Sequence, residues 1–325
     1  MVRVAYKGSP ANGRPHPAFA SANRTPKGAS GIIGRVIDPI AFHLGPIAVH
    51  WYGIIIASAV LIAGLVGTRE ARRRGEDPEQ GWSMLLLVIV TSVIAARAYH
   101  VIHMWGYYSQ HLDLIPQIWL GGIGIPGAVA GGAFGIWLYC RWNHLSTARW
   151  LDIFAPALLL GQAIGRLGNF VNQELYGPPT TLPWGIPIDA AHRVMPWDPI
   201  NYPVDTTRFT PLFAYEAILN LIGMVVLLWV AHRFAKKLYD GDIALMYIIW
   251  YGAVRSALET FRVNNWVILG VPTAIWIGII GILLAAAFLI VRHRRHWGTP
   301  GAWMDRSDET DAGASQPSNP EPQPG

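Results

Sequence analysis

Charged residues are scarce in this chain: Asp, Glu, Lys and Arg make up 14% of its 325 residues. An ordinary soluble domain carries about 25%, so much of the usual solvating surface is missing. The hydrophobic residues, 52% of the total, fall in long blocks and not at the helical or strand periods of a soluble core. The composition therefore excludes a large soluble domain and predicts an integral membrane protein.

Cysteine is also nearly absent. Cys140 is the only one, which excludes an intrachain disulfide framework and a cysteine-based metal site. His100 and His103 have the spacing i, i+3, but no third ligand stands near them, so we expect no metal and no other cofactor. The net charge of +5 is modest, and no basic patch is interleaved with aromatic residues. We therefore expect membrane lipids as partners, through anionic headgroups, and no nucleic acid.

Seven apolar stretches approach the ~20 residues that a transmembrane helix needs. They predict an all-α integral membrane protein with about seven transmembrane helices. The expected spans are Ile47–Thr68, Trp82–Trp105, Ile123–Arg141, Leu151–Leu167, Leu212–Ala231, Ile243–Phe261 and Pro272–Val291.

The connections between these spans alternate in charge, which predicts the orientation. Those on one side carry Arg69, Arg72, Arg73 and Arg74, then Arg141 and Arg149, then Arg233, Lys236 and Lys237, and finally Arg292, Arg294 and Arg295. The connections on the other side hold few positive residues. By the positive-inside rule, the N-terminus lies outside and the C-terminus lies in the cytoplasm.

Two segments flank the seven-helix membrane domain 47–292, and a third is inserted into it. Residues 1–46 are rich in Gly, Pro and Ala, and we expect a largely disordered extracytoplasmic extension, unless the true start lies further downstream. Residues 293–325 predict a disordered cytoplasmic tail. Residues 168–211 form a long connection rich in Pro and Trp, which predicts a small extracytoplasmic head between spans four and five.

Ionisable residues inside the spans are candidates for a functional site. Tyr251, Arg255, Glu259 and Arg262 are spaced i, i+4, i+8 and i+11, so they share one face of the sixth span. They can bind a ligand, or they can form an internal Arg–Glu ladder that holds the helix bundle together.

A second cluster follows span four in the run Gly165–Glu174. Arg166 and Asn169 share one side of a helix, and a guanidinium group beside carboxamides suits a phosphate. A polar helix cap is the alternative. Further polar residues also map to the outer half of the membrane and predict a cavity open to the outer leaflet. They are His50 and Tyr52 in span one, Arg97 and His100 in span two, and Arg208, Tyr215 and Glu216 at the start of span five.

Four motifs resemble prolipoprotein diacylglyceryl transferases, over about residues 32–292. They are Gly165-Arg166-Leu167-Gly168-Asn169-Phe170-Val171-Asn172-Gln173-Glu174 with Gly177, His50-Trp51-Tyr52-Gly53, Pro211 with Tyr215-Glu216, and Tyr251-Gly252-Ala253-Val254-Arg255 with Glu259 and Arg262. The resemblance implies a multi-pass enzyme of the bacterial inner membrane. Such an enzyme moves the diacylglyceryl group of phosphatidylglycerol to the lipobox cysteine of a prolipoprotein signal peptide, and glycerol phosphate leaves.

The resemblance and the expected cavity together give the site residues. The expected catalytic residues are Arg166, Arg255, Glu174 and Tyr251. The expected phosphatidylglycerol-binding residues are Arg166, Asn169, Tyr52, Gly177, Arg255, Arg262, Arg97 and Glu216.

One position departs from the family pattern. Many members carry a histidine in the glycine-rich stretch that enters span three, and this histidine is often proposed as the base. Here Pro126 stands in its place. Three interpretations follow, and we favour the first. The histidine is dispensable because the arginines lower the pKa of the substrate thiol, or another residue (Glu174, Glu216, His100 or a tyrosine) is the base, or the chain is an inactive lipid-binding scaffold.

A transporter or flippase for anionic lipids or solutes would also use seven spans and buried arginines. It would need polar residues that reach both sides of the membrane, and we expect the polar residues here to gather at the outer end. Nor does the sequence contain an inverted repeat. The sequence therefore favours the enzyme.

Overall fold

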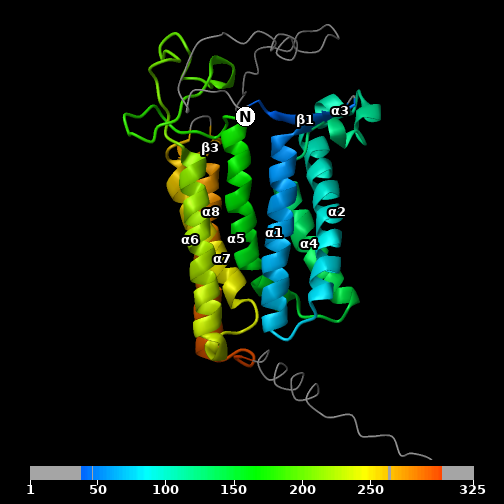
Figure 1. Cartoon of the computed structure of the whole chain (residues 1–325). Coiled ribbons are helices and arrows are strands. Elements are labelled where there is room, and N and C mark those ends of the chain that lie inside the picture. The colour runs from blue at the N-terminus through cyan, green and yellow to red at the C-terminus, as the bar shows by residue number, and fades with distance from the viewer. Residues whose placement is uncertain (1–37, 46, 263–264, 302–325) are drawn as a thin grey trace, which may run out of the picture. The chain divides into compact units, whose positions relative to one another are not determined.

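Helices make up most of the computed structural model, which describes residues 38–45, 47–262 and 265–301 (Figure 1). The long helices are α1 (Trp51–Arg73), α2 (Pro78–His103), α4 (Ile125–Trp142), α5 (Thr147–Val171), α6 (Leu212–Arg233), α7 (Asp242–Glu259) and α8 (Thr273–Arg295). Short helical turns are α3 (Trp105–Tyr108), η2 (Leu112–Leu114), η3 (Ile118–Leu120), η4 (Ala190–His192) and η5 (Ala235–Lys237). Strands β1 (Ile40–Leu44) and β2 (Ile47–His50) form one antiparallel hairpin, and β3 (Val267–Ile268) and β4 (Val271–Pro272) form another.

Five helices are long and apolar enough to cross a membrane: α1, α2, α5, α6 and α8. The prediction of a helical, multi-pass membrane protein is therefore confirmed. The remaining two long helices, α4 and α7, have 18 residues each. Helix α7 is less apolar because it carries Asp242, Arg255 and Glu259. Helix α4 is rich in glycine, which contributes little hydrophobicity.

The structure corrects both ends of the first predicted span. Residues Ile47–His50 pair with β1 as a strand, and the helix begins only at Trp51. It then continues past Thr68 to Arg73, so Arg69, Arg72 and Arg73 are helical and not part of a connection. The physical reason is that arginine is a good helix former, and cations are favoured in the last helical turn by the helix dipole.

Other boundaries shift in the same direction. Helix α5 begins after Ser146, whose hydroxyl accepts a hydrogen bond from the Arg149 backbone N–H at 3.4 Å, and it continues to Val171. The first residues of the expected head, 168–171, are therefore helical. Helix α8 extends to Arg295, into the expected tail. Most of the expected N-terminal extension and C-terminal tail lie outside the described residues.

The long helices pack in pairs that define the bundle (Figure 1): α2 lies along α4, α1 along α5, α5 along α6, and α7 along α8. Helices α2 and α4 approach at their backbones, because Gly127, Gly131 and Gly135 face α2 at a spacing of four residues. A methyl group at Gly127 or Gly131 would collide with the carbonyl oxygen of Ala95 or Thr91. Small residues at this spacing let two membrane helices approach at their backbones.

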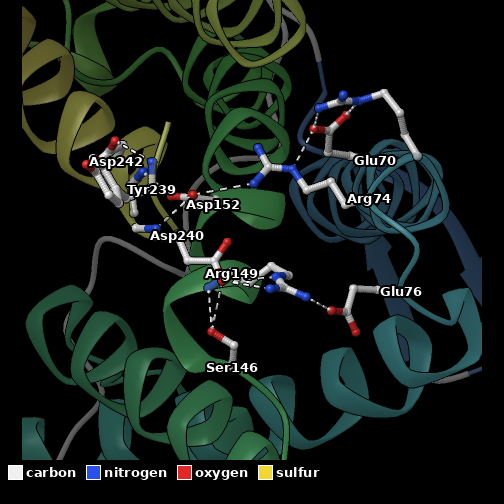
Figure 2. A network of polar contacts seen from close by, with 12 residues as sticks. Glu70, Arg74, Glu76, Ser146, Arg149, Asp152, Tyr239, Asp240 and Asp242 are labelled. Carbon is white, nitrogen blue, oxygen red and sulfur yellow. Dashed lines mark hydrogen bonds and ion pairs between the residues drawn. The ribbon is translucent and has the colours of Figure 1, made fainter. Parts of the chain in front are cut away.

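Buried ion pairs connect the helices at the end of the bundle where α5 begins, the opposite end from Val171, the last residue of α5 (Figure 2). Arg149 contacts Glu76 at 2.8 Å and Asp240 at 2.9 Å. Asp152 accepts hydrogen bonds at 2.8 Å from the backbone N–H groups of Gly241 and Ala244, at the start of α7. We call this set the opposite-end network; its members are Glu70, Arg74, Glu76, Arg149, Asp152, Asp240 and Asp242.

This network corrects the expectation that buried polar residues gather at the outer end alone. Arg74 and Arg149, which the sequence offered as orientation signals, are 2% and 4% exposed and paired with carboxylates. An apolar cluster, which includes Leu159, Leu227 and Ile243, is buried between α5, α6 and α7. The position of the charges alone therefore does not separate an enzyme from a transporter.

The connection 172–211 between α5 and α6 has a small core of its own. Tyr176, Ile188 and Phe209 are buried together, and isolated bridges join Phe209 to Pro179 and Ile186. The Arg193 guanidinium lies 4.5 Å from the centre of the Phe209 ring. The connection is thus a folded segment, and we call it the head segment.

Candidate functional site

Five charged residues, four on helices α5, α6 and α7 and one in the turn that follows α7, form a continuous chain of ion pairs at the end of α5 that leads into the head segment. Arg166 pairs with one oxygen of Glu216, and Arg262 Nη2 donates to the other oxygen at 3.1 Å. Arg262 Nε also lies 3.9 Å from Glu259 Oε2, and Glu259 pairs with Arg255. We call these five residues the arginine cluster.

Helix packing explains why residues far apart in sequence meet here. Arg166 is near the end of α5 and Glu216 is in the first turns of α6, so the two antiparallel neighbours place them at the same level. The Arg–Glu ladder expected on the sixth span is present between Arg255, Glu259 and Arg262, although α7 ends at Glu259 and Arg262 lies in the turn that follows. It extends beyond α7, however, because Glu216 joins it to α5.

The electrostatics of the cluster favour an anion. Glu216 and Glu259 are 1% and 5% exposed, whereas the side chains of Arg166 and Arg255 are 19% and 23% exposed. Three guanidinium groups face two carboxylates, so the cluster carries one net positive charge. The buried carboxylates hold the guanidinium groups in place from the interior of the bundle. Each guanidinium group has N–H donors that these carboxylates do not use, so they can bind a further ligand.

Two carboxamides extend the cluster toward the head segment. Arg166 Nη1 donates to Asn169 Oδ1 at 2.9 Å, and Asn169 Nδ2 donates to Glu174 Oε1 at 2.8 Å. Asn172 Nδ2 donates to the same oxygen at 3.3 Å. Asn169 therefore bonds to side chains and not to the backbone of the helix end, which argues against a simple polar cap. Glu174 is exposed.

Two tyrosines lie beside the cluster. A methyl group at Gly168 would be 2.7 Å from Tyr52 Cδ2, so the Tyr52 ring packs directly on the α5 backbone next to Asn169. Tyr251 precedes Arg255 by four residues on α7, so the two share one face of the helix. The Tyr251 ring stacks on that of Tyr247 at 5.9 Å.

Arg97 has a different environment from the one expected. Its guanidinium donates to the carbonyl oxygens of Ile115 (2.8 Å), Gly121 (2.7 Å), Gly122 (2.9 Å) and Leu114 (2.6 Å). Arg97 thus holds the connection between α2 and α4 in place, and its contact with lipid stays a prediction.

Gly177 packs the head segment against the start of α6. Its N–H donates to the carbonyl of Thr210 at 2.8 Å, and a methyl group there would be 2.8 Å from Leu212 Cγ. Its expected contact with lipid is likewise a prediction that the geometry leaves open.

An apolar groove beside the cluster was missed by the sequence analysis. Its volume is about 500 Å³, and it lies between the end of α5, the head segment and the start of α6. Its lining includes Phe170, Trp184, Ile186, Phe213 and Tyr215. Trp184 Nε1 donates to the Tyr215 hydroxyl at 2.7 Å across it. The motif at Tyr215-Glu216 was the only available signal, because nothing in the sequence indicates which residues of the head segment return to α6.

The chain resembles known proteins along most of its length. Residues 39–291 match the family described as prolipoprotein diacylglyceryl transferase. The phosphatidylglycerol–prolipoprotein diacylglyceryl transferase of Pediococcus pentosaceus is 38% identical over 259 residues, which cover 79% of this chain and 91% of that protein. The enzymes of the same name from Leifsonia xyli subsp. xyli and Chloroflexus aggregans are each 37% identical, over 84% and 78% of this chain and 85% and 89% of their own lengths.

Proposed function

The chain belongs to the prolipoprotein diacylglyceryl transferase family, and we propose that the arginine cluster is the place where it performs the family's reaction. It is a membrane-bound transferase that moves a diacylglyceryl group from phosphatidylglycerol to a prolipoprotein. The acceptor is the thiol of the lipobox cysteine in the signal peptide. The observation that carries the proposal is a net positive cluster whose carboxylates are buried and whose guanidinium groups are partly open.

The chemistry explains why arginines are needed. The thiol sulfur attacks the glyceryl carbon that is bonded to the phosphate oxygen, a thioether forms, and the C–O bond breaks. Glycerol phosphate leaves with the electron pair of that bond, so negative charge builds up on the phosphate oxygen. Arg166 and Arg255 stabilise this charge, since fixed cations in a water-poor site cost little reorganisation at the moment of reaction. Tyr251, beside Arg255, orients the headgroup.

Glu174 is the best-placed proton acceptor for the thiol. Both oxygens of Glu216 are occupied by arginines, whereas Glu174 is exposed and its carboxylate accepts hydrogen bonds from two neutral carboxamides. Pro126, which stands where many relatives carry histidine, occupies the first turn of α4 and has no proton to exchange. The free thiol has a pKa near 8.5, and the positive field of the cluster lowers it further.

The membrane arrangement belongs to the same proposal. Helices α4 and α7 lie along α2 and α8, and 18 residues rise about 27 Å at 1.5 Å each, close to the hydrocarbon thickness. We infer seven spans in the bacterial cytoplasmic membrane, with the N-terminus and the head segment outside. The arginine cluster then faces the outer leaflet, and the apolar groove offers its surface to an acyl chain or to the signal peptide.

The test is a transfer assay with purified protein in liposomes that contain phosphatidylglycerol. Mass spectrometry follows the addition of a diacylglyceryl group to a lipobox peptide. Arg166→Ala and Arg255→Ala should each abolish transfer while the protein stays folded. Arg141→Ala is the matched control, because Arg141 is an exposed arginine in the last turn of α4, and this variant should keep the wild-type rate.

Transfer by the wild type would also show that Pro126 is compatible with activity. Glu174→Gln should then slow transfer most strongly at low pH, where less of the thiol is ionised. A folded wild-type protein that binds the lipid without modifying the peptide would refute the enzyme and leave the scaffold.

A further inference from the structure

Uncharged polar groups without partners lie one helical turn deeper than the arginine cluster. Asn220 is fully buried at 0% exposure, and neither Nδ2 nor Oδ1 has a hydrogen-bond partner among the described residues. Gln162 Oε1 is also buried and unpartnered there. Gln162 Nε2 donates to the Tyr247 hydroxyl at 2.9 Å, and the structure shows no acceptor in its described part for the hydrogen of that hydroxyl.

The helix geometry brings these three side chains to the same level. Asn220 follows Glu216 by four residues on α6, so the two side chains lie on the same face of that helix. Gln162 precedes Arg166 by four residues on α5, so these two also share a helix face. Arg166 and Glu216 form an ion pair, and α5 and α6 are antiparallel. One helical turn further into the bundle, α5 therefore presents Gln162 and α6 presents Asn220 at the same level. We call Gln162, Asn220 and Tyr247 the carboxamide tier.

The tier needs an outside partner. A buried polar group without a hydrogen bond costs about 1–3 kcal/mol, and the hydrocarbon core of a membrane supplies no water to replace the missing bonds. Replacement by leucine would remove this penalty. The unpartnered groups therefore indicate a polar ligand group that enters the bundle below the phosphate position.

Phosphatidylglycerol has its polar groups in the matching order. Its phosphate is charged and lies outermost, and its two ester carbonyls are neutral acceptors a few covalent bonds deeper. The cluster is cationic, and the tier about 5.4 Å below it is neutral. The tier also offers two unused donors, the Asn220 carboxamide N–H and the Tyr247 O–H, for two ester carbonyls.

We propose that Asn220 and Tyr247 are positioning residues that donate hydrogen bonds to the ester carbonyls of the diacylglyceryl group, with Gln162 orienting Tyr247. This inference rests on the proposed function, because it assumes that the phosphate binds at the arginine cluster. It makes the enzyme selective for ester-linked lipid. The two carbonyls and the phosphate together fix the glyceryl carbon that the thiol attacks.

The experiment compares ester-linked phosphatidylglycerol with its dialkyl ether analogue, which has the same headgroup and no carbonyls. We expect wild-type kcat/KM to be about three- to tenfold higher for the diester, the value of one or two neutral hydrogen bonds. Asn220→Leu should bring the ratio close to one by slowing the diester and leaving the diether unchanged. Tyr247→Phe should reduce the ratio partly.

Two controls separate positioning from folding. Ser256→Ala removes a hydroxyl of α7 that faces Gly278 of α8 and has no hydrogen-bond partner in the described part of the chain, and it should keep the wild-type ratio. Asn220→Leu should leave the melting temperature unchanged or raise it, because the unpartnered carboxamide is gone. A structural role would predict the opposite.

The outcomes distinguish this inference from the proposed function. The proposed role of the carboxamide tier is refuted if the wild type uses both lipids equally, or if Asn220→Leu and Tyr247→Phe both keep the wild-type ratio. Neither result would contradict the proposed transferase activity. A wild type that transfers from neither lipid overturns the proposed function and the tier with it.

Discussion

At Gly168 the backbone of α5 touches the ring of Tyr52, a contact that only a residue without a Cβ permits. Gly168 immediately precedes Asn169, which bonds to Arg166. The position of the Tyr52 ring therefore depends on a missing methyl group next to the arginine cluster. Such close approaches are a common reason for glycine at a functional site.

We expect Gly168→Ala to reduce transfer about 10- to 100-fold, the effect of a displacement of about 1 Å at a reacting centre. The new methyl group would push Tyr52 away and shift Asn169. Gly161→Ala is the matched control on the same helix, because its methyl group would meet Ala63 Cβ at an ordinary 3.5 Å. The control should keep activity and gain slightly in stability from the helix propensity of alanine. Equal activity of both variants would contradict the role of the contact.

The charged residues of the arginine cluster could be singled out from the sequence because a charge inside a membrane span is exceptional. The residues of the proposed carboxamide tier could not: Asn220 and Gln162 are ordinary in composition, and only their burial without partners among the described residues makes them notable. The bonds of Arg97 were also beyond sequence reasoning. Its depth in the span suggested a lipid contact, but its acceptors are backbone carbonyls of a connection whose path depends on tertiary structure.

The head segment depends on Tyr176 at the scale of a single element. Its hydroxyl accepts from the Val194 N–H at 2.8 Å and donates to the His192 carbonyl at 3.1 Å. Burial raises the pKa of the Tyr176 hydroxyl above its usual value. The neutral form is thus the one that the folded head segment accommodates.

The sign of the pH effect follows from this shift. In the unfolded segment Tyr176 ionises near pH 10, whereas the folded segment keeps it neutral, so stability falls as the pH rises through that value. Tyr176→Phe should lower the melting temperature at pH 8, and its deficit relative to the wild type should shrink as the pH rises above 10. Tyr107→Phe, at an exposed tyrosine, controls for general alkaline effects. A deficit that stays constant with pH would contradict the assignment.

Helix existence was easier to predict than helix ends. Each of the seven apolar stretches forms a long helix, because the length of an uninterrupted apolar run can be read from neighbouring residues alone. The ends moved where local chemistry extended a helix, as at Arg73 and Arg295. The strand at Ile47–His50 was missed, since four apolar residues before a helix read as its first turn until their pairing partner is known.

The opposite-end network acts on the whole molecule, because it joins the ends of α1, α5 and α7 far from the arginine cluster. Arg149→Gln would leave Glu76 and Asp240 without their shared cation. We expect a loss of about 3–5 kcal/mol in the free energy of unfolding, the usual result of breaking a buried ion pair from one side. Thermal unfolding in detergent measures it.

Transfer per folded Arg149→Gln molecule should remain close to the wild type, because the change is remote from the reacting atoms. Arg141→Gln, at an exposed position near the same end, should change neither quantity. A selective loss of activity in stable Arg149→Gln protein would mean that the two ends are coupled.

The orientation of the whole molecule can be tested with single engineered cysteines. Ser109→Cys lies in the exposed connection between α2 and α4, and Asn143→Cys lies in the exposed connection between α4 and α5. An impermeant maleimide should label the first in right-side-out membrane vesicles and the second only in inverted vesicles. The wild type should stay unlabelled because Cys140 is fully buried. The reverse pattern would overturn the proposed topology.

The site of Cys140 has a consequence for an enzyme that alkylates thiols. The residue sits near the end of α4, packed in an apolar cluster with Met84, Trp150 and Ile153. The connection 104–124, which Arg97 holds through the carbonyl oxygens of Gly121 and Gly122, leads into the first turn of α4. Cys140 is near the last turn, so almost the whole length of α4 separates its thiol from the glycine-rich stretch that precedes the helix. The enzyme therefore carries its own thiol where the fold leaves no exposed surface on it, and it is protected from becoming a substrate of its own reaction.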